Sequence, residues 1–260
     1  MIAKETKPHR NIIKPTEKIN MYLTERQFIT LPLVMGIALL IMSCGETQRD
    51  ARNFLHKAKS FENGKQYAQA EVAYKKAIAI YEKNNSKDDS VMAVCWGGLG
   101  RVYLLQEKFA DAESALKHAI QIDTVISEDK VANLYALALA ISFARNQNEY
   151  DEAEEYLEEA IINLAIVCMM DPNTDAWKVC PDYYAELADI QVATEKFEEA
   201  EKNYKNAIEI YEAYTKTTQP SDRFVRTLRN YSALLFAMGK NSEATAISER
   251  AEELQNDINK

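Results

Sequence analysis

The sequence predicts an all-α protein made of about five repeated helix pairs, and three observations lead to this fold class. The chain has 260 residues, of which 47% are hydrophobic, yet it contains only seven glycines and six prolines. Residues that favour helices are abundant, and runs of β-branched residues are scarce. Apolar residues follow a helical period from Ala51 onwards, and one pattern of large and small residues recurs around five alanines: Ala70, Ala112, Ala153, Ala200 and Ala244.

The clearest copy of this pattern is Trp96–Ala119, WGGLGRVYLLQEKFADAESALKHA. The positions that define it are Trp96, Leu99, Gly100 and Tyr103 in a first helix, then Ala112, Leu116 and Ala119 in a second. Because Gly100 and Ala112 are small, the two antiparallel helices can touch there. We expect the large residues of the pattern to lie in the core around that contact.

The order W-x2-L-G-x2-Y followed by A-x3-L-x2-A resembles the consensus of the tetratricopeptide repeat (TPR). The alanines lie 41 to 47 residues apart, which exceeds the roughly 34 residues of a standard repeat. The segments AEVAYKKAIAIYEK and AEKNYKNAIEIYEAY are similar to second helices of the longer kinesin-light-chain type. The resemblance implies a right-handed α-solenoid with its first helices on an inner surface, and a non-catalytic role in protein–protein interaction. The expected repeats within residues 51–260 span 51–86, 87–126, 128–168, 181–217 and 221–258.

Polar segments separate the expected repeats. Residues 84–90, NNSKDDS, offer an N-cap for the helix that begins near Val91, and Ser127 and Ser221 do the same for later helices. An insertion at residues 169–182, MMDPNTDAWKVCPD, lengthens the step between the third and fourth repeats. Since its two prolines stop or start helices, we expect a structured loop there.

The N-terminal segment predicts that the protein is attached to a membrane. Residues 1–43 resemble a leader with a signal peptide, and residues 44–50 form a polar tether. The sequence Ile41-Met42-Ser43-Cys44 resembles the lipobox of bacterial lipoproteins, which implies cleavage before Cys44 and lipidation of its thiol. Gly45 follows the cysteine, which by the sorting rule of those proteins implies the outer membrane, facing the periplasm.

Two alternatives remain open for this segment. The apolar core at residues 31–43 would span about 20 Å as a helix, less than the ~30 Å of a hydrocarbon core. However, residues 27–45 carry no charge, so an uncleaved single-pass inner-membrane anchor holding a cytosolic TPR module is also possible. Met21 is an alternative start of the chain.

The charge and the motifs bear on the class of function. The formal net charge is −9, with +3 in residues 1–44 and −12 in the remainder, which argues against a nucleic-acid partner. We find no P-loop, dinucleotide-binding, HExxH or CxxC motif, so we expect no catalytic residue, metal or cofactor. An alternative is a helical-repeat enzyme with a carboxylate site in the groove, for which Asp182 and Asp189 are the candidates.

Three further cysteines need an interpretation. Cys95 precedes Trp96 and is expected to be a small buried residue. Cys168 and Cys180 flank the insertion, and in an oxidising periplasm they would form a disulfide that fixes this loop. Two separate thiols are the alternative.

The candidate partner-binding residues come from the positions of each first helix that face the groove in TPR folds. These are Arg52, Lys59, Val94, Arg101, Leu104, Arg226 and Arg229. Asn230 is added because it matches one of the paired asparagines that the resemblance to kinesin-light-chain grooves implies. We expect the basic residues to meet carboxylates of a protein or peptide ligand and the apolar residues to meet an apolar side chain. Gly97 and Gly98 have no role in the repeat pattern, and we expect another group to approach the backbone there.

Overall fold

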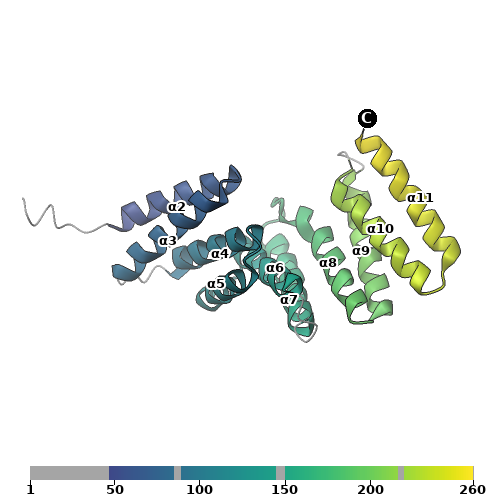
Figure 1. Ribbon diagram of the computed structural model, residues 1–260, viewed down its shortest axis with the longest axis horizontal. Helices are drawn as coiled ribbons and strands as arrows, with labels where there is room; N and C mark the ends of the chain where they lie inside the picture. The colour runs from purple at the N-terminus through teal and green to yellow at the C-terminus, as the bar shows by residue number, and fades with distance from the viewer. Residues whose placement is uncertain (1–46, 85–88, 145–149, 216–219, 260) are drawn as a thin grey trace, which may run out of the picture. The chain divides into compact units, whose positions relative to one another are not determined.

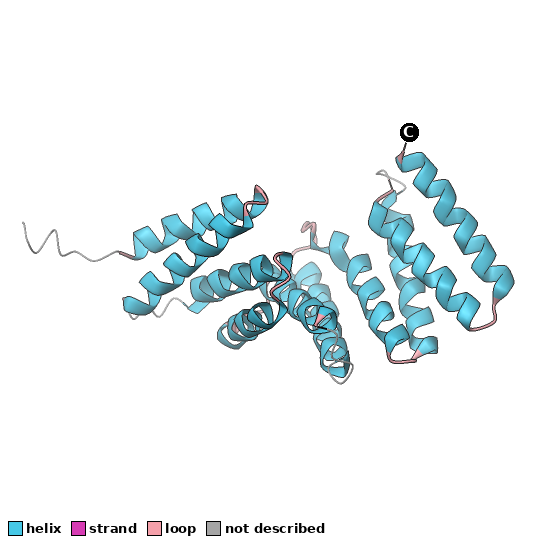
Figure 2. Cartoon of the chain, in the orientation of Figure 1, coloured by secondary structure: helices cyan, strands magenta, loops and turns pink. Residues whose placement is uncertain are grey.

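The structure is a computed structural model that describes residues 47–84, 89–144, 150–215 and 220–259. In these residues the chain forms ten α-helices, one short 3₁₀ helix and no strand (Figures 1 and 2). The helices are α2 Gln48–Asn63, α3 Tyr67–Lys83, α4 Asp89–Leu105, α5 Phe109–Ile122, α6 Glu128–Phe143, α7 Tyr150–Met170, η2 Ala176–Val179, α8 Cys180–Ala193, α9 Phe197–Thr215, α10 Asp222–Ala237 and α11 Asn241–Ile258. Among the described residues, the first helix begins at Gln48, within the predicted tether, rather than at Ala51.

Consecutive helices pair into five hairpins, and the predicted fold class is confirmed. The closest packing lies within the pairs α2–α3, α4–α5, α6–α7, α8–α9 and α10–α11. The second helix of each pair packs on the first helix of the next, and α4 also packs on α2 and α6, as α10 does on α8. Each hairpin thus buries one face against its neighbour, which is the architecture of an α-solenoid.

The core follows the predicted register. The five alanines of the repeated pattern, Ala70, Ala112, Ala153, Ala200 and Ala244, are each 0% exposed. Leu99, Tyr103 and Leu116 are buried as expected. Trp96 differs, because it is only partly buried. Its ring packs against the core cluster and lies edge-on to the exposed His118, with 4.8 Å between the ring centroids.

Four of the hairpin turns share one backbone geometry. The turn residues Lys65, Glu107, Glu195 and Gly239 all have positive φ, between 57° and 76°. In the second hairpin the amide of Lys108 donates to the carbonyl of Tyr103, and the amide of Glu107 donates to that of Leu104. The other three turns repeat this pair of bonds, which defines a Schellman motif that satisfies carbonyls at the helix end.

Two predicted helix starts are confirmed by side-chain caps. The Ser127 hydroxyl accepts a hydrogen bond from the Lys130 amide at 3.2 Å, and the Ser221 hydroxyl accepts one from the Phe224 amide at 3.3 Å. The insertion is structured: α7 runs to Met170, η2 follows a turn, and Pro181 stands in the first turn of α8.

The predicted leader and Cys44 lie outside the described residues. Within the part of the chain that is described, no helix combines the length and apolar character needed to cross a membrane.

Candidate functional site

The first helices α2, α4, α6, α8 and α10 form what we call the first-helix surface. The candidate partner-binding residues lie on these helices, and their surroundings differ. Arg52 and Lys59 of α2 are exposed, whereas Val94 and Leu104 of α4 are partly buried. Whether these four residues meet a partner stays a prediction.

Arg101 is held in place by side chains from two neighbouring repeats. Its Nη1 atom donates to Oδ1 of Asn133 on α6 at 2.8 Å, and its Nε lies 3.4 Å from Oε1 of Glu62 on α2. Glu62 in turn accepts a hydrogen bond from the Tyr74 hydroxyl of α3 at 2.5 Å. This chain of polar contacts fixes the guanidinium at the first-helix surface and gives its charge a partner.

The glycines at positions 97, 98 and 100 each make room for a side chain of a different helix. A β-carbon at Gly97 would overlap the Asn133 side chain of α6, and one at Gly98 would overlap the Tyr74 ring of α3. A β-carbon at Gly100 would overlap Leu116 of α5. The close approach expected at Gly97 and Gly98 is therefore confirmed, and the approaching groups belong to the chain itself.

Further along the surface, α8 and α10 are joined by three carboxylates. Asp182, Glu186 and Asp189 follow one another along one face of α8 at helical spacing. Asp182 is only 7% exposed, and it accepts hydrogen bonds from the Tyr211 hydroxyl of α9 and from Arg223 of α10.

The other two carboxylates of α8 are also engaged. Glu186 pairs with Arg226, and Asp189 accepts hydrogen bonds from the Tyr204 hydroxyl and from Nδ2 of Asn230 at 3.0 Å. Burial raises the pKa of both Glu186 and Asp189 above the usual range of carboxyl groups. The ion pair of Glu186 and the hydrogen bonds to Asp189 therefore offset part of the free energy that burial of these carboxylates costs.

Three of the predicted partner-binding residues, Arg226, Arg229 and Asn230, already make contacts within the chain. Arg226 and Asn230 hold two repeats together through Glu186 and Asp189. Arg229 turns toward the second helix of its own hairpin, where its Nη2 lies 3.3 Å from Oε1 of Gln255. Acids recur at helical spacing on α8, as do Arg223, Arg226 and Asn230 on α10, but this spacing alone does not show which of them pair.

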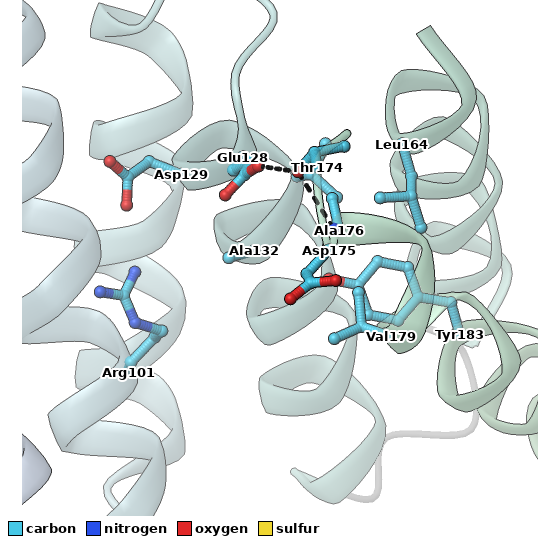
Figure 3. A pocket seen from close by; sticks show the side chains of 11 residues that line it. Arg101, Glu128, Asp129, Ala132, Leu164, Thr174, Asp175, Ala176, Val179 and Tyr183 are labelled. Atoms are coloured by element: carbon cyan, nitrogen blue, oxygen red, sulfur yellow. Dashed lines mark hydrogen bonds between the residues drawn. The ribbon is translucent and has the colours of Figure 1, made fainter. Parts of the chain in front are cut away.

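A cavity opens on the first-helix surface where the third and fourth repeats meet (Figure 3). Its volume is about 480 Å³, within the size range of small-ligand sites. Arg101 stands on one side, and Val179 of η2 and Tyr183 of α8 stand opposite. The first turn of α6 supplies Glu128 and Asp129. The inserted segment therefore builds one wall of the cavity, and this site was not foreseen from the sequence.

The three carboxylates around this cavity have different partners. Glu128 accepts a hydrogen bond from the Thr174 hydroxyl at 2.6 Å, and Asp175 pairs with Lys178 at 2.6 Å. Asp129 has no ion pair or hydrogen bond to any residue that the structure describes. It is partly buried, so one carboxylate of the cavity is both reachable and unpaired.

An apolar wall faces these charges. Val131, Leu164 and Tyr183 belong to one buried cluster between α6, α7 and α8, and all three line the cavity. The Tyr183 ring stacks on Tyr135 of α6, with ring centroids 4.2 Å apart and an interplanar angle of 12°. The wall is thus part of the packed core, and only a small part of the Val131, Leu164 and Tyr183 side chains is exposed.

Cys168 and Cys180 pack against this same cluster. Their sulfurs are unbonded, and so is that of Cys95, which is buried as expected. Burial raises the pKa of the Cys180 thiol to about 11 and raises that of Cys168 in the same direction. The disulfide stays a prediction.

Among the described residues, no group of three or more His, Cys, Asp or Glu side chains is placed to hold a metal ion.

Comparison with known families gives matches over most of the helical region. Tetratricopeptide repeat models match residues 50–124 and 136–162, and the SHNi-TPR model matches residues 181–217. No curated protein sequence matches the chain.

Several solved structures share the fold. BtubC (BKLC) from P. vanneervenii is 16% identical, with 90% of this chain and 92% of that chain covered and a TM-score of 0.66. A Podosopora anserina protein named for kinesin light chain, with nearly identical TPR-like repeats, is 18% identical, with coverages of 82% and 98% and a TM-score of 0.62. YrrB, described as a TPR protein with an unusual peptide-binding site, is 16% identical, with coverages of 85% and 92% and a TM-score of 0.55.

Proposed function

Because this chain belongs to the tetratricopeptide repeat proteins, with repeats like those of kinesin light chain, we propose that it is a non-catalytic scaffold that binds a peptide segment of a partner protein at its first-helix surface. The observation that carries this proposal is the cavity of about 480 Å³ at the junction of the third and fourth repeats. It offers both an apolar wall and an unpaired carboxylate.

The distribution of polar contacts supports this position for the peptide. Between α8 and α10 the first-helix surface is occupied by intramolecular pairs such as Glu186–Arg226. A peptide that bound there would have to replace them. At the cavity, side chains of four helices and η2 face the same open space.

The same pairs favour a scaffold over an enzyme. Asp182 and Asp189 are the carboxylates that a groove enzyme would use. Both are engaged by tyrosine hydroxyls and by side chains of α10, so neither is held ready to transfer a proton to a substrate.

The anchoring part of the proposal rests on the sequence. We propose that Cys44 carries a lipid that tethers the solenoid to the outer membrane on its periplasmic side. In cells fed an alkyne analogue of palmitate, the full chain should be labelled, and Cys44→Ala should abolish labelling. A labelled Cys44→Ala chain, or an unlabelled full chain, would contradict lipidation and favour the uncleaved anchor.

The binding proposal can be tested with an immobilised library of nine-residue peptides and the solenoid purified without its leader. Val179→Arg places a long charged side chain at the cavity wall, whereas Val72→Arg makes the same change at an exposed position of α3. We expect Val179→Arg to lose most of the binding and Val72→Arg to retain it. No binding by the unaltered protein, or equal binding by the two variants, would refute the proposal.

A further inference from the structure

We propose that the cavity at the junction of the third and fourth repeats receives a basic side chain, lysine or arginine, of the bound peptide. This inference rests on the peptide-binding function proposed above and names the chemistry that the cavity selects. Its evidence is the set of partners that the charged residues of the cavity already have.

Among the described residues that line the cavity, Arg101 is the one cation, and its charge already has a partner within the chain. Its guanidinium already contacts Asn133 at 2.8 Å and Glu62 at 3.4 Å. An acidic peptide would have to share this guanidinium with Glu62 while lying close to Glu128 and Asp129. Repulsion between the negative charges of the peptide and these two carboxylates would oppose binding.

The carboxylates of the cavity leave a place for a positive charge. Asp175 is paired with Lys178, and from the described residues Glu128 accepts one hydrogen bond, that of the neutral Thr174 hydroxyl. Asp129 has no partner among the described residues and is partly buried. An ammonium or guanidinium group near Glu128 and Asp129 would therefore form charge-assisted hydrogen bonds without breaking an existing ion pair.

The rest of the cavity suits the stem of such a side chain. Lysine and arginine carry three or four methylene groups that favour apolar surface while the charged end stays near polar groups. Val179, which is 38% exposed, provides that surface opposite Arg101, and the buried Leu164 and Tyr183 support it. Residues 45–260 have a net charge of −12, which also steers a basic partner toward the solenoid and opposes an acidic one.

The test compares four peptide libraries that are identical except for a fixed central residue: lysine, arginine, glutamate or leucine. We expect the solenoid to bind the lysine or arginine libraries best, and the affinity of a selected basic peptide to fall as sodium chloride is added. Asp129→Asn should weaken that peptide about tenfold, which corresponds to about 1.4 kcal/mol. Asp129→Lys should transfer the preference to the glutamate library.

The matched control is Glu198→Gln, which removes an exposed acid from the first turn of α9, away from the cavity. Like Asp129→Asn, this change removes one favourable negative charge from a helix N-terminus. Circular dichroism of both variants therefore shows whether losing such a charge alters the fold. We expect Glu198→Gln to leave peptide binding unchanged. Preference for glutamate or leucine, or undiminished binding by Asp129→Asn, would overturn this inference while leaving peptide binding intact. Failure of all four libraries would instead overturn the proposed function.

Discussion

The Asn133 side chain of α6 occupies the space that a side chain at Gly97 of α4 would need. Asn133 is 0% exposed, and from this position it accepts the hydrogen bond of Arg101. A glycine inside a helix lowers its stability by about 1 kcal/mol relative to alanine. Here the missing β-carbon allows two first helices to approach and places a polar side chain between them.

Gly97→Ala should therefore destabilise the protein although alanine favours the helix. Overpacking costs about 1–3 kcal/mol, which exceeds the gain in helix propensity. Urea denaturation should show the loss, and a second change, Asn133→Ala, should make Gly97→Ala less harmful. Ser114→Ala, an exposed change on α5, serves as the control that gains propensity alone. A Gly97→Ala variant as stable as the unaltered protein would show that the helices can shift apart freely.

Gly239→Ala tests the turn geometry in isolation. Gly239 has a φ of 76°, and nothing lies within 4 Å of a β-carbon built there. Any cost is therefore conformational, and we expect about 1 kcal/mol, a fall of roughly 2–4 °C in Tm for a domain of this size. The reciprocal change Glu195→Gly, at a φ of 60°, should not lower Tm. A lower Tm for the glycine variant would contradict this account.

Arg223→Ala should weaken the junction between the fourth and fifth repeats. It leaves the carboxylate of Asp182, which is 7% exposed, with the Tyr211 hydroxyl alone. Because the Arg223 side chain is itself 64% exposed, solvent screens the pair and we expect a loss of about 1–2 kcal/mol.

A double-mutant cycle with Asp182→Asn checks this assignment by urea denaturation. The two changes should be less than additive if the residues interact directly. Arg229→Ala, which removes an exposed contact to Gln255, is the matched control and should have little effect. Strict additivity would count against the pair.

The acid sensitivity of the first two repeats should depend on Glu71. Its oxygens lie 2.7 Å from Lys75 Nζ and 2.9 Å from Lys108 Nζ, and the hydrogen bond from Lys75 foremost lowers its pKa from 4.5 to about 2. A carboxyl group whose pKa is lower in the folded state stabilises the protein above its unfolded pKa, and this stability is lost as the pH falls through the folded value.

In the unaltered protein, the contribution of Glu71 to the free energy of unfolding should therefore fall as the pH falls from about 4.5 to about 2. Because both lysines are about half exposed, we expect only about 1 kcal/mol from this group. Glu71→Gln should remove that part of the pH dependence, whereas Glu198→Gln should preserve it. Urea denaturation at several pH values gives the comparison, and identical pH profiles for Glu71→Gln and the unaltered protein would refute the assignment.

The helices, their pairing and the register of the core could be predicted from the amino-acid pattern. The repeated alanines could be identified because hydrophobic periodicity is a local property, and all five are fully buried. The caps at Ser127 and Ser221 could be predicted for the same reason, since a cap and its amide lie three residues apart.

Which charged residues pair with each other could not be predicted in this way. Glu186 and Arg226 lie 40 residues apart, and Asp189 and Asn230 lie 41 apart. Whether such residues pair depends on the offset between successive hairpins and on side-chain direction, which the apolar pattern does not contain. The cavity depends in addition on the path of the inserted segment, because η2 supplies one of its walls. The tertiary structure therefore shows that Arg226 and Asn230 make contacts within the chain, and that Asp129 at the cavity has no partner among the described residues.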